Sequence, residues 1–279
     1  MTTKDQYINS LKSLDKFNID YKKIYTKSTL KKVLETIKKI PNQRSTLSKE
    51  TISIPTIKKY ILSIIYYYKS INKYSDNMKK MFKPVIDNFN NVLRNKIEEN
   101  KLQGNQKKNY IEWEDVIEIY KKLEKTEYDR SLKSYVDFVL LSLYVLFPPR
   151  RSKDYAIMKI GKPKGKSFNY YWNGKFYFNN YKTSKDIGNQ IFDVPTNLVN
   201  IINDFIKKYK VTGLLLKKNI QGIYSKLASL LGKQASVNIL RHSYISYVLN
   251  NNKLSIKDKR EIANKMAHSI TTQAEYVKI

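Results

Sequence analysis

The chain has 279 residues, with 53 lysines and arginines against 24 acidic residues and a formal net charge of +29. A hydrophobic content of 41% excludes a disordered polycation, and the lack of cysteine excludes disulfides and thiolate metal sites. No apolar run reaches the roughly 18–20 residues of a membrane span, and the first ten residues are too polar for a secretory signal. We therefore expect a soluble intracellular protein that binds a polyanion, with nucleic acid as the first candidate and an anionic membrane surface as the second.

The positive charge is spread along the whole chain. Residues 1–108 and residues 109–279 carry almost the same excess of basic over acidic side chains. A basic tail would have concentrated that excess at one end. The distribution predicts a protein that surrounds its ligand, although a composition rich in lysine, asparagine, isoleucine and tyrosine is also typical of an AT-rich genome.

The first hundred residues have the apolar spacing of amphipathic helices. Residues Leu30–Ile40 place apolar side chains on one face and end at Pro41. The stretch Ser53–Thr56 predicts the start of a second helix, because serine caps helices and proline is favoured in their first turn. We expect its apolar positions to be Ile57, Tyr60, Ile61, Ile64, Ile65 and Tyr68. A third helix is expected over about 76–99, with Pro84 as a kink or a boundary.

The polar stretch Leu102–Lys108 is the predicted domain boundary. It separates a helical domain over 1–108 from a second domain over 109–279. The second domain is expected to begin with a helix over Glu112–Glu124, whose acidic residues lie near its N-terminus. The most apolar helix of the chain, Ser131–Phe147, should follow and form the core.

Strands are predicted after Pro148-Pro149, which ends that apolar helix. Residues 168–194 have the pattern of three strands, with a hairpin turn at Asn173-Gly174 and a second break near 186–188. Helical spacing returns from about Asn197, and Ser255 with Asp258 resembles a capping box. The sequence thus predicts a mainly α-helical α+β protein with a small antiparallel sheet in its second domain.

Four segments of the second domain hold the candidate functional residues. They are 148–155, 181–185, 238–244 and 266–269, the last followed by Tyr276. In this order they resemble the tyrosine recombinase family of phage-type integrases and Xer-type resolvases. The family pattern is an arginine after a buried helix, a lysine in a β-hairpin, a His-x-x-Arg box, a later histidine and a tyrosine nucleophile. The resemblance covers residues 109–279, and the region before it is similar only in being small and helical.

The resemblance implies six catalytic residues: Arg151, Lys182, Asn238, Arg241, His268 and Tyr276. The family's first box often reads Thr-Gly-x-Arg-x-x-Glu, and here Arg151 with Asp154 fits that spacing while Pro148-Pro149 replace Thr-Gly. Residues 240–244 fit the ending Leu-Arg-His-Ser-Tyr of the third box. Tyr276 follows His268 by eight positions, one fewer than is usual.

The chemistry implied by the resemblance suits these residue types. Two guanidiniums, from Arg151 and Arg241, would hold the non-bridging oxygens of a negatively charged phosphorane. Lys182, or Lys185 as the second choice, would protonate the leaving 5′-oxygen. Tyr276 would attack and keep the phosphate as a phosphotyrosine, so that rejoining needs no ATP, metal or other cofactor.

Several assignments stay open at this stage. Arg150 could be the functional arginine, and Arg151 could instead form a structural ion pair with Asp154. Asn238 stands where the family has histidine, and an amide can hydrogen-bond a phosphate but cannot transfer a proton. We expect His242 to be a structural residue, because neighbours on a helix point about 100° apart. Only three residues follow Tyr276, so we expect protomers to interact through a surface other than the family's C-terminal tail.

The expected function is that of a site-specific DNA recombinase or integrase. The resemblance implies a C-shaped clamp on double-stranded DNA, a homotetramer on paired sites, no small-molecule substrate and a location wherever the DNA is. The Pro-Pro-Arg-Arg and Tyr-Lys-Thr-Ser-Lys stretches resemble those of integrases of eukaryotic DNA viruses and their mobile satellites. The alternatives are a type IB topoisomerase and a DNA-binding protein that kept the fold without the activity.

Overall fold

The computed structural model describes residues 2–42, 51–98, 102, 105–126, 131–251 and 253–277. The chain divides into two compact units, residues 1–99 and residues 100–279. The division precedes the polar stretch 102–108 at which we expected the boundary, and part of that stretch forms the short helix α5 (Asn105–Asn109). Among the helices described, none has the length and apolar character needed to cross a membrane.

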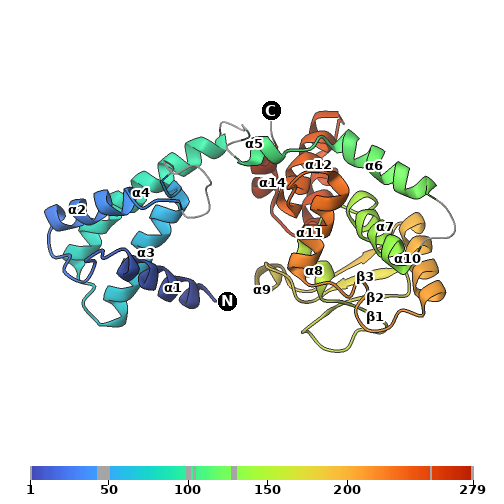
Figure 1. Cartoon of the computed structure of the whole chain (residues 1–279), viewed down its shortest axis with the longest axis horizontal. Coiled ribbons are helices and arrows are strands. Elements are labelled where there is room, and N and C mark those ends of the chain that lie inside the picture. Colours follow the sequence, from blue (N-terminus) through green and yellow to red (C-terminus); the bar gives the residue numbers. More distant parts are fainter. Residues whose placement is uncertain are drawn as a thin grey trace. The chain divides into compact units, whose positions relative to one another are not determined.

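The helices of the first unit are joined by loops, and an isolated β-bridge links Pro41 to Thr51. The unit contains α1 (Thr3–Lys16), α2 (Lys27–Lys38), α3 (Ile54–Ser70) and α4 (Asp76–Glu98), coloured blue to cyan-green in Figure 1. The predicted start of α3 is confirmed, with Ser53 at the cap position and Pro55 in the first turn. The six apolar positions expected on α3 are all buried. Pro84 lies inside α4 and does not end it, so the possible boundary there was wrong.

Hydrogen bonds from a buried tyrosine hold the loop before α2 against α3. Tyr68 is 1% exposed, and its hydroxyl accepts from the backbone N–H of Ile24 at 2.8 Å and donates to the carbonyl of Tyr21 at 3.1 Å. A buried hydroxyl needs such partners because desolvating it without them is costly. Tyr68 therefore both fills the core and fixes a loop.

The second unit packs its helices around α7. The helices before the sheet are α6 (Trp113–Lys125), α7 (Leu132–Val145) and α8 (Ser152–Ala156). As predicted, α7 is the core helix: Phe138–Tyr144 is buried without interruption. Its polar Ser142 is accommodated because the hydroxyl donates to the carbonyl of Phe138 at 2.7 Å. The proline pair that follows ends α7 and starts the segment that carries Arg150 and Arg151.

The sheet has four strands, one more than expected. They are β1 (Met158–Ile160), β2 (Asn169–Trp172), β3 (Lys175–Phe178) and β4 (Gln190–Asp193), in that order across the sheet. The predicted hairpin is confirmed, since β2 and β3 are antiparallel and Asn173 and Gly174 both have positive φ. The prediction of an antiparallel sheet was wrong in one respect. Strand β1 pairs in parallel with β2, so the sheet is mixed, and three residues are too few to show a strand pattern in sequence.

The remaining elements bring the C-terminal half of the unit around the candidate site. They are α9 (Ser184–Ile187), α10 (Thr196–Tyr209), α11 (Ile220–Leu231), α12 (Val237–Asn251), α13 (Ile256–Lys265) and α14 (Ile270–Tyr276). Figure 1 shows α12 and α14, in orange and red, above α8 and the sheet. The predicted capping box of Ser255 and Asp258 is confirmed at the start of α13.

Candidate active site

The site lies where four segments far apart in the sequence meet. Arg151 precedes α8, Arg241 lies in α12, His268 lies between α13 and α14, and Tyr276 is the last residue of α14. The link between the last two helices is a Schellman motif: His268 N–H bonds Ala263 O at 3.1 Å and Ala267 N–H bonds Asn264 O at 3.0 Å. This cap fixes the position of His268, and Ser269 then caps α14.

Arg241 is the centre of the site. It is 1% exposed, and one guanidinium nitrogen (Nη1) donates to the carbonyls of Pro149 at 2.6 Å and Met266 at 3.0 Å. Its Nη2 lies 2.8 Å from His268 Nδ1, and its Nε donates to Tyr276 Oη at 3.4 Å. One guanidinium thus holds the histidine and the tyrosine in a single arrangement.

Tyr276 is held at both ends. Its hydroxyl donates to Asn238 Oδ1 at 3.1 Å, and its backbone carbonyl lies 2.9 Å from His242 Nδ1. The His242 and Tyr276 rings are 4.4 Å apart between centroids. His242 therefore positions the tyrosine, a contact that its place beside Arg241 in the sequence did not reveal.

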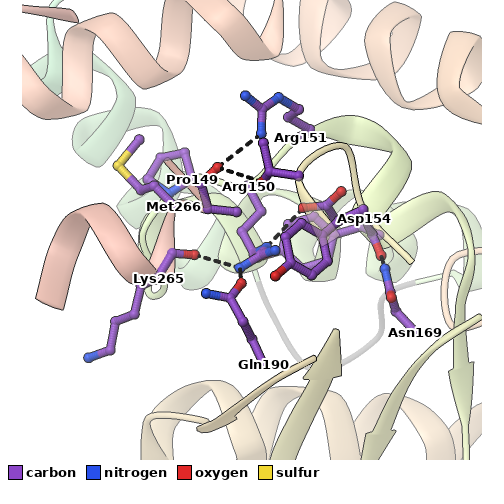
Figure 2. A network of polar contacts seen from close by, with 12 residues as sticks. Pro149, Arg150, Arg151, Asp154, Asn169, Gln190, Lys265 and Met266 are labelled. Atoms are coloured by element: carbon purple, nitrogen blue, oxygen red, sulfur yellow. Dashed lines mark hydrogen bonds and ion pairs between the residues drawn. The ribbon is translucent and has the colours of Figure 1, made fainter. Parts of the chain in front are cut away.

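The two consecutive arginines have different environments. Arg150 is fully buried, and Figure 2 shows its guanidinium turned toward Gln190 and Lys265 while Arg151 points the other way. Arg150 Nε pairs with Asp154 at 2.9 Å, and its Nη1 donates to Gln190 Oε1 at 3.0 Å and to the carbonyl of Lys265 at 2.9 Å. The guanidinium also stacks 3.8 Å from the centroid of the Phe178 ring.

Arg151 remains open to a ligand. It is half-buried and donates to the carbonyl of Ala267 at 3.3 Å. The possible ion pair between Arg151 and Asp154 was wrong, because Arg150 makes that pair. Arg150 directs its guanidinium to Asp154, Gln190 and the carbonyl of Lys265, so the geometry selects Arg151 of the two candidates.

His268 is neutral in this environment. It is 7% exposed, and burial together with the charges of Arg241, Arg151 and Arg150 lowers its pKa to about 3. A guanidinium can only donate, so His268 Nδ1 must accept and its proton must be on Nε2. His268 Nε2 is buried and makes no hydrogen bond within the described residues. The Nε2–H group can therefore donate a hydrogen bond to a bound ligand.

Lys182 lies in the turn after β3, and Lys185 lies in the short helix α9 that follows the turn. Lys182 and Lys185 are both exposed, and within the described chain neither ammonium makes a hydrogen bond or an ion pair. The turn itself contacts the site, because Thr183 Oγ1 donates to the carbonyl of Ala267 at 3.2 Å. The structure thus brings Arg151, Asn238, Arg241, His268 and Tyr276 together and leaves Lys182 at the edge, one residue from this contact.

The site carries excess positive charge. Among the described residues, Asp154 is the one carboxylate in ion-pair contact with Arg150, Arg151 or Arg241. Carbonyls at the C-terminal end of α13 supply part of the compensation, since that end of a helix is partially negative. Burial, and after it the charge of Arg241, lowers the pKa of Arg151. An anion would compensate the excess charge of the site.

The comparisons with known proteins give a distant likeness. No family model matches the sequence, and a search of curated proteins finds no relative. Among solved structures, the chain is similar to the XerH site-specific recombinase bound to its difH substrate in a pre-cleavage complex. The two chains share 14% identity over 92% of this chain and 68% of the recombinase, with a TM-score of 0.47. The functional roles that follow are therefore assigned from this chain's own residues.

Proposed function

We propose that this protein is a tyrosine recombinase that cleaves and rejoins duplex DNA at specific sites through a 3′-phosphotyrosine intermediate. The observation that carries the proposal is the position of Tyr276 Oη. It lies 3.4 Å from Arg241 Nε, in a cluster of guanidiniums with excess positive charge and an unused histidine donor. A phenol beside an anion site is the arrangement that transfer of a phosphodiester to tyrosine requires.

The anion that fits the cluster is a phosphodiester. Arg151 can direct N–H groups to non-bridging oxygens, and Arg241 can redirect the Nε–H that now donates to Tyr276 Oη. His268 Nε2–H can supply a further donor. These donors are fixed before substrate arrives, because backbone carbonyls and Nδ1 of His268 already hold them. Fixed donors stabilise the extra negative charge of the phosphorane more than that of the resting diester.

The cleavage step exchanges one ester bond for another. Tyr276 Oη forms a bond to phosphorus and the bond to the 5′-oxygen breaks, while Lys182 gives that oxygen a proton. The phenol proton passes to water, because Asn238 accepts a hydrogen bond at this exposed contact but cannot take a proton. Rejoining is the reverse reaction with a new 5′-hydroxyl, and the phosphotyrosine bond retains the energy for it.

Assembly and cell biology are also part of the proposal. We infer that both units bind duplex DNA, since both carry a large excess of basic residues. Four protomers would act on two sites, as the family resemblance implies, and the protein would act wherever that DNA is located. An origin in a viral or other mobile element remains an expectation from the sequence.

Two other functions use the same geometry. A type IB topoisomerase would relax supercoils without joining two sites. A DNA-binding protein without activity would keep the basic cluster but not cleave, and Asn238 in place of a proton-transferring histidine is the feature that favours it. The bond between Asn238 and Tyr276 favours the enzyme, because the amide orients the phenol.

The test is capture of a covalent adduct. The full-length protein is incubated with a nicked duplex library whose central positions are randomised, and adducts that survive detergent are isolated and sequenced. We expect adducts on a restricted set of sequences. Tyr276→Phe should abolish them and leave DNA binding intact, whereas Tyr224→Phe, which changes a half-buried tyrosine bonded to Gln234, should behave as the wild type. A wild type that forms no adduct contradicts the proposal, and adducts without sequence preference together with plasmid relaxation favour the topoisomerase.

A further inference from the structure

The end of α13 is the place where the sheet and the helical part of the site are tied together. Four consecutive carbonyls there accept hydrogen bonds from side chains of other elements. The donors are, in order along the carbonyls of 264–267, Gln190, Arg150, Arg241, and finally Arg151 with Thr183. Carbonyls at a helix end lack intrahelical partners, so this segment is suited to such contacts.

Ala267 is the point at which these contacts converge on the reacting groups. Its carbonyl accepts from Arg151 at 3.3 Å and from Thr183 Oγ1 at 3.2 Å, and its neighbour is His268. Thr183 in turn follows Lys182 directly. A single buried carbonyl therefore connects the lysine turn, an arginine and the histidine.

The other anchors of the lysine turn tie it to the sheet and to itself. Asn180 N–H donates to Asn169 Oδ1 at 2.8 Å, and the Asn180 carbonyl accepts from Asn169 Nδ2 at 3.2 Å. Tyr181 is buried, and its hydroxyl donates to the carbonyl of Gly188 at 2.5 Å, which closes the turn on itself. Lys182 is exposed and carries its ammonium on a flexible stem. The hydroxyl of Thr183 is the contact that relates the backbone of this turn to the segment leading to Tyr276.

We propose that Thr183 is a positioning residue that places Lys182 for protonation of the leaving 5′-oxygen. The inference rests on the proposed function. Thr183 does not touch the substrate and acts only through the hydrogen bond to Ala267. Loss of that bond leaves the arginines, His268 and Tyr276 in place and displaces the proton donor alone.

The test separates a proton-transfer defect from a general one by changing the leaving group. A duplex with sulfur in place of the bridging 5′-oxygen expels a thiolate, which needs no proton because its conjugate acid is much stronger than an alcohol. Thr183→Val keeps the shape of the side chain and removes the hydroxyl. We expect Thr183→Val to cleave the ordinary duplex about 10- to 100-fold more slowly and the sulfur-containing duplex as fast as the wild type.

Matched variants make the result specific. Lys182→Ala should show the same pattern with a larger loss on the ordinary duplex. Thr183→Ser keeps a hydroxyl and should restore the rate. Ser184→Ala, in the next residue of the turn, should cleave both duplexes as the wild type does.

Each outcome decides the matter. A Thr183→Val variant that is slow on both duplexes has a structural role only, and one that is normal on both has no role, so either result overturns the inference. A wild type that forms no adduct on either duplex overturns the proposed function and this inference with it. If the wild type cleaves both duplexes, the proposed function stands, and a failed prediction for the Thr183 variants then contradicts only the inference about Thr183.

Discussion

Arg150 and Arg151 are neighbours in the sequence and occupy opposite kinds of environment. Arg150 is enclosed by Asp154, Gln190, a carbonyl and an aromatic ring, and has no exposed surface. Arg151 is half-buried, and within the described residues it makes one longer hydrogen bond, to the carbonyl of Ala267. The same charged group is therefore used once to hold the fold together and once to meet a ligand.

The difference shows how burial and pairing together separate structural from functional charge. A buried guanidinium is stable only when carboxylate and hydrogen-bond partners compensate its lost hydration. Arg150 has such partners at Nε and Nη1, although its Nη2 makes no hydrogen bond within the described residues. His268 Nε2 is likewise buried without a partner there, and it lies in the same cluster as Arg151 and Tyr276, where an anion could accept from it.

The largest expected effect comes from removing the enclosed charge. Arg150→Met leaves Asp154 buried without its partner, and we expect the second unit to lose about 3–5 kcal/mol of stability. Both tryptophans, Trp113 and Trp172, lie in that unit, so tryptophan fluorescence during urea unfolding reports it alone. The double variant Arg150→Met/Asp154→Leu should recover much of the loss. A single variant as stable as the wild type would contradict the structural role of Arg150.

Substitution of Arg151 should impair cleavage and leave stability nearly unchanged, in contrast to substitution of Arg150. Arg151→Met removes a ligand of the phosphorane, and we expect adduct formation to fall by about 10²–10³-fold, or about 2.7–4 kcal/mol of transition-state stabilisation. Its fluorescence-detected unfolding should stay close to that of the wild type, because one longer hydrogen bond is lost. A variant that unfolds early and still cleaves would reverse the roles of the two arginines.

Sequence alone predicted the elements whose signals are local. The burial of one face of α3, the hairpin at Asn173-Gly174 and the capping box at Ser255 follow from spacing and turn chemistry, and all are confirmed. Local patterns carry this information because they depend on neighbours within a few positions. The family resemblance of four ordered segments, which is not a local signal, implied five side chains that the structure brings together.

The rest depended on contacts between distant parts of the chain. Arg150, and not Arg151, pairs with Asp154. Its guanidinium is also held by Gln190 and by the carbonyl of Lys265, which are 40 and 115 positions away in the sequence. The contact of Thr183 with Ala267 spans 84 positions, and no pattern near Thr183 indicates it. Strand β1 was missed because its pairing with β2, rather than its own sequence, defines it.

A pH-dependent effect should distinguish His268 from an ordinary histidine. The pKa of His268 is about 3 in the folded protein, whereas the usual value of 6.5 applies to the unfolded chain. Protonation of His268 therefore favours the unfolded chain. Above pH 6.5 the titration of His268 does not lower the free energy of unfolding. As the pH drops from 6.5 toward 3, it lowers that free energy by about 1.4 kcal/mol per pH unit. His268→Gln should remove that part of the slope in urea unfolding measured at a series of pH values. Parallel slopes for the two proteins would mean that His268 is not buried as a neutral base.

The smallest expected effect concerns the residue whose carbonyl Arg151 and Thr183 share. Ala267 has φ of +55°, a left-handed backbone that costs an alanine roughly 1–2 kcal/mol and a glycine nothing comparable. Ala267→Gly relieves that cost but loses a buried methyl group and gains freedom when unfolded, so we expect stability within about 0.5 kcal/mol of the wild type. Ala263→Gly is the matched control, since Ala263 is equally buried but lies inside α13, and it should lose about 1 kcal/mol or more. Equal losses at both positions in urea unfolding would mean that the turn at Ala267 is unstrained. A difference between them would show that the chain accepts strain at the residue whose carbonyl accepts from both Arg151 and Thr183 and which directly precedes His268.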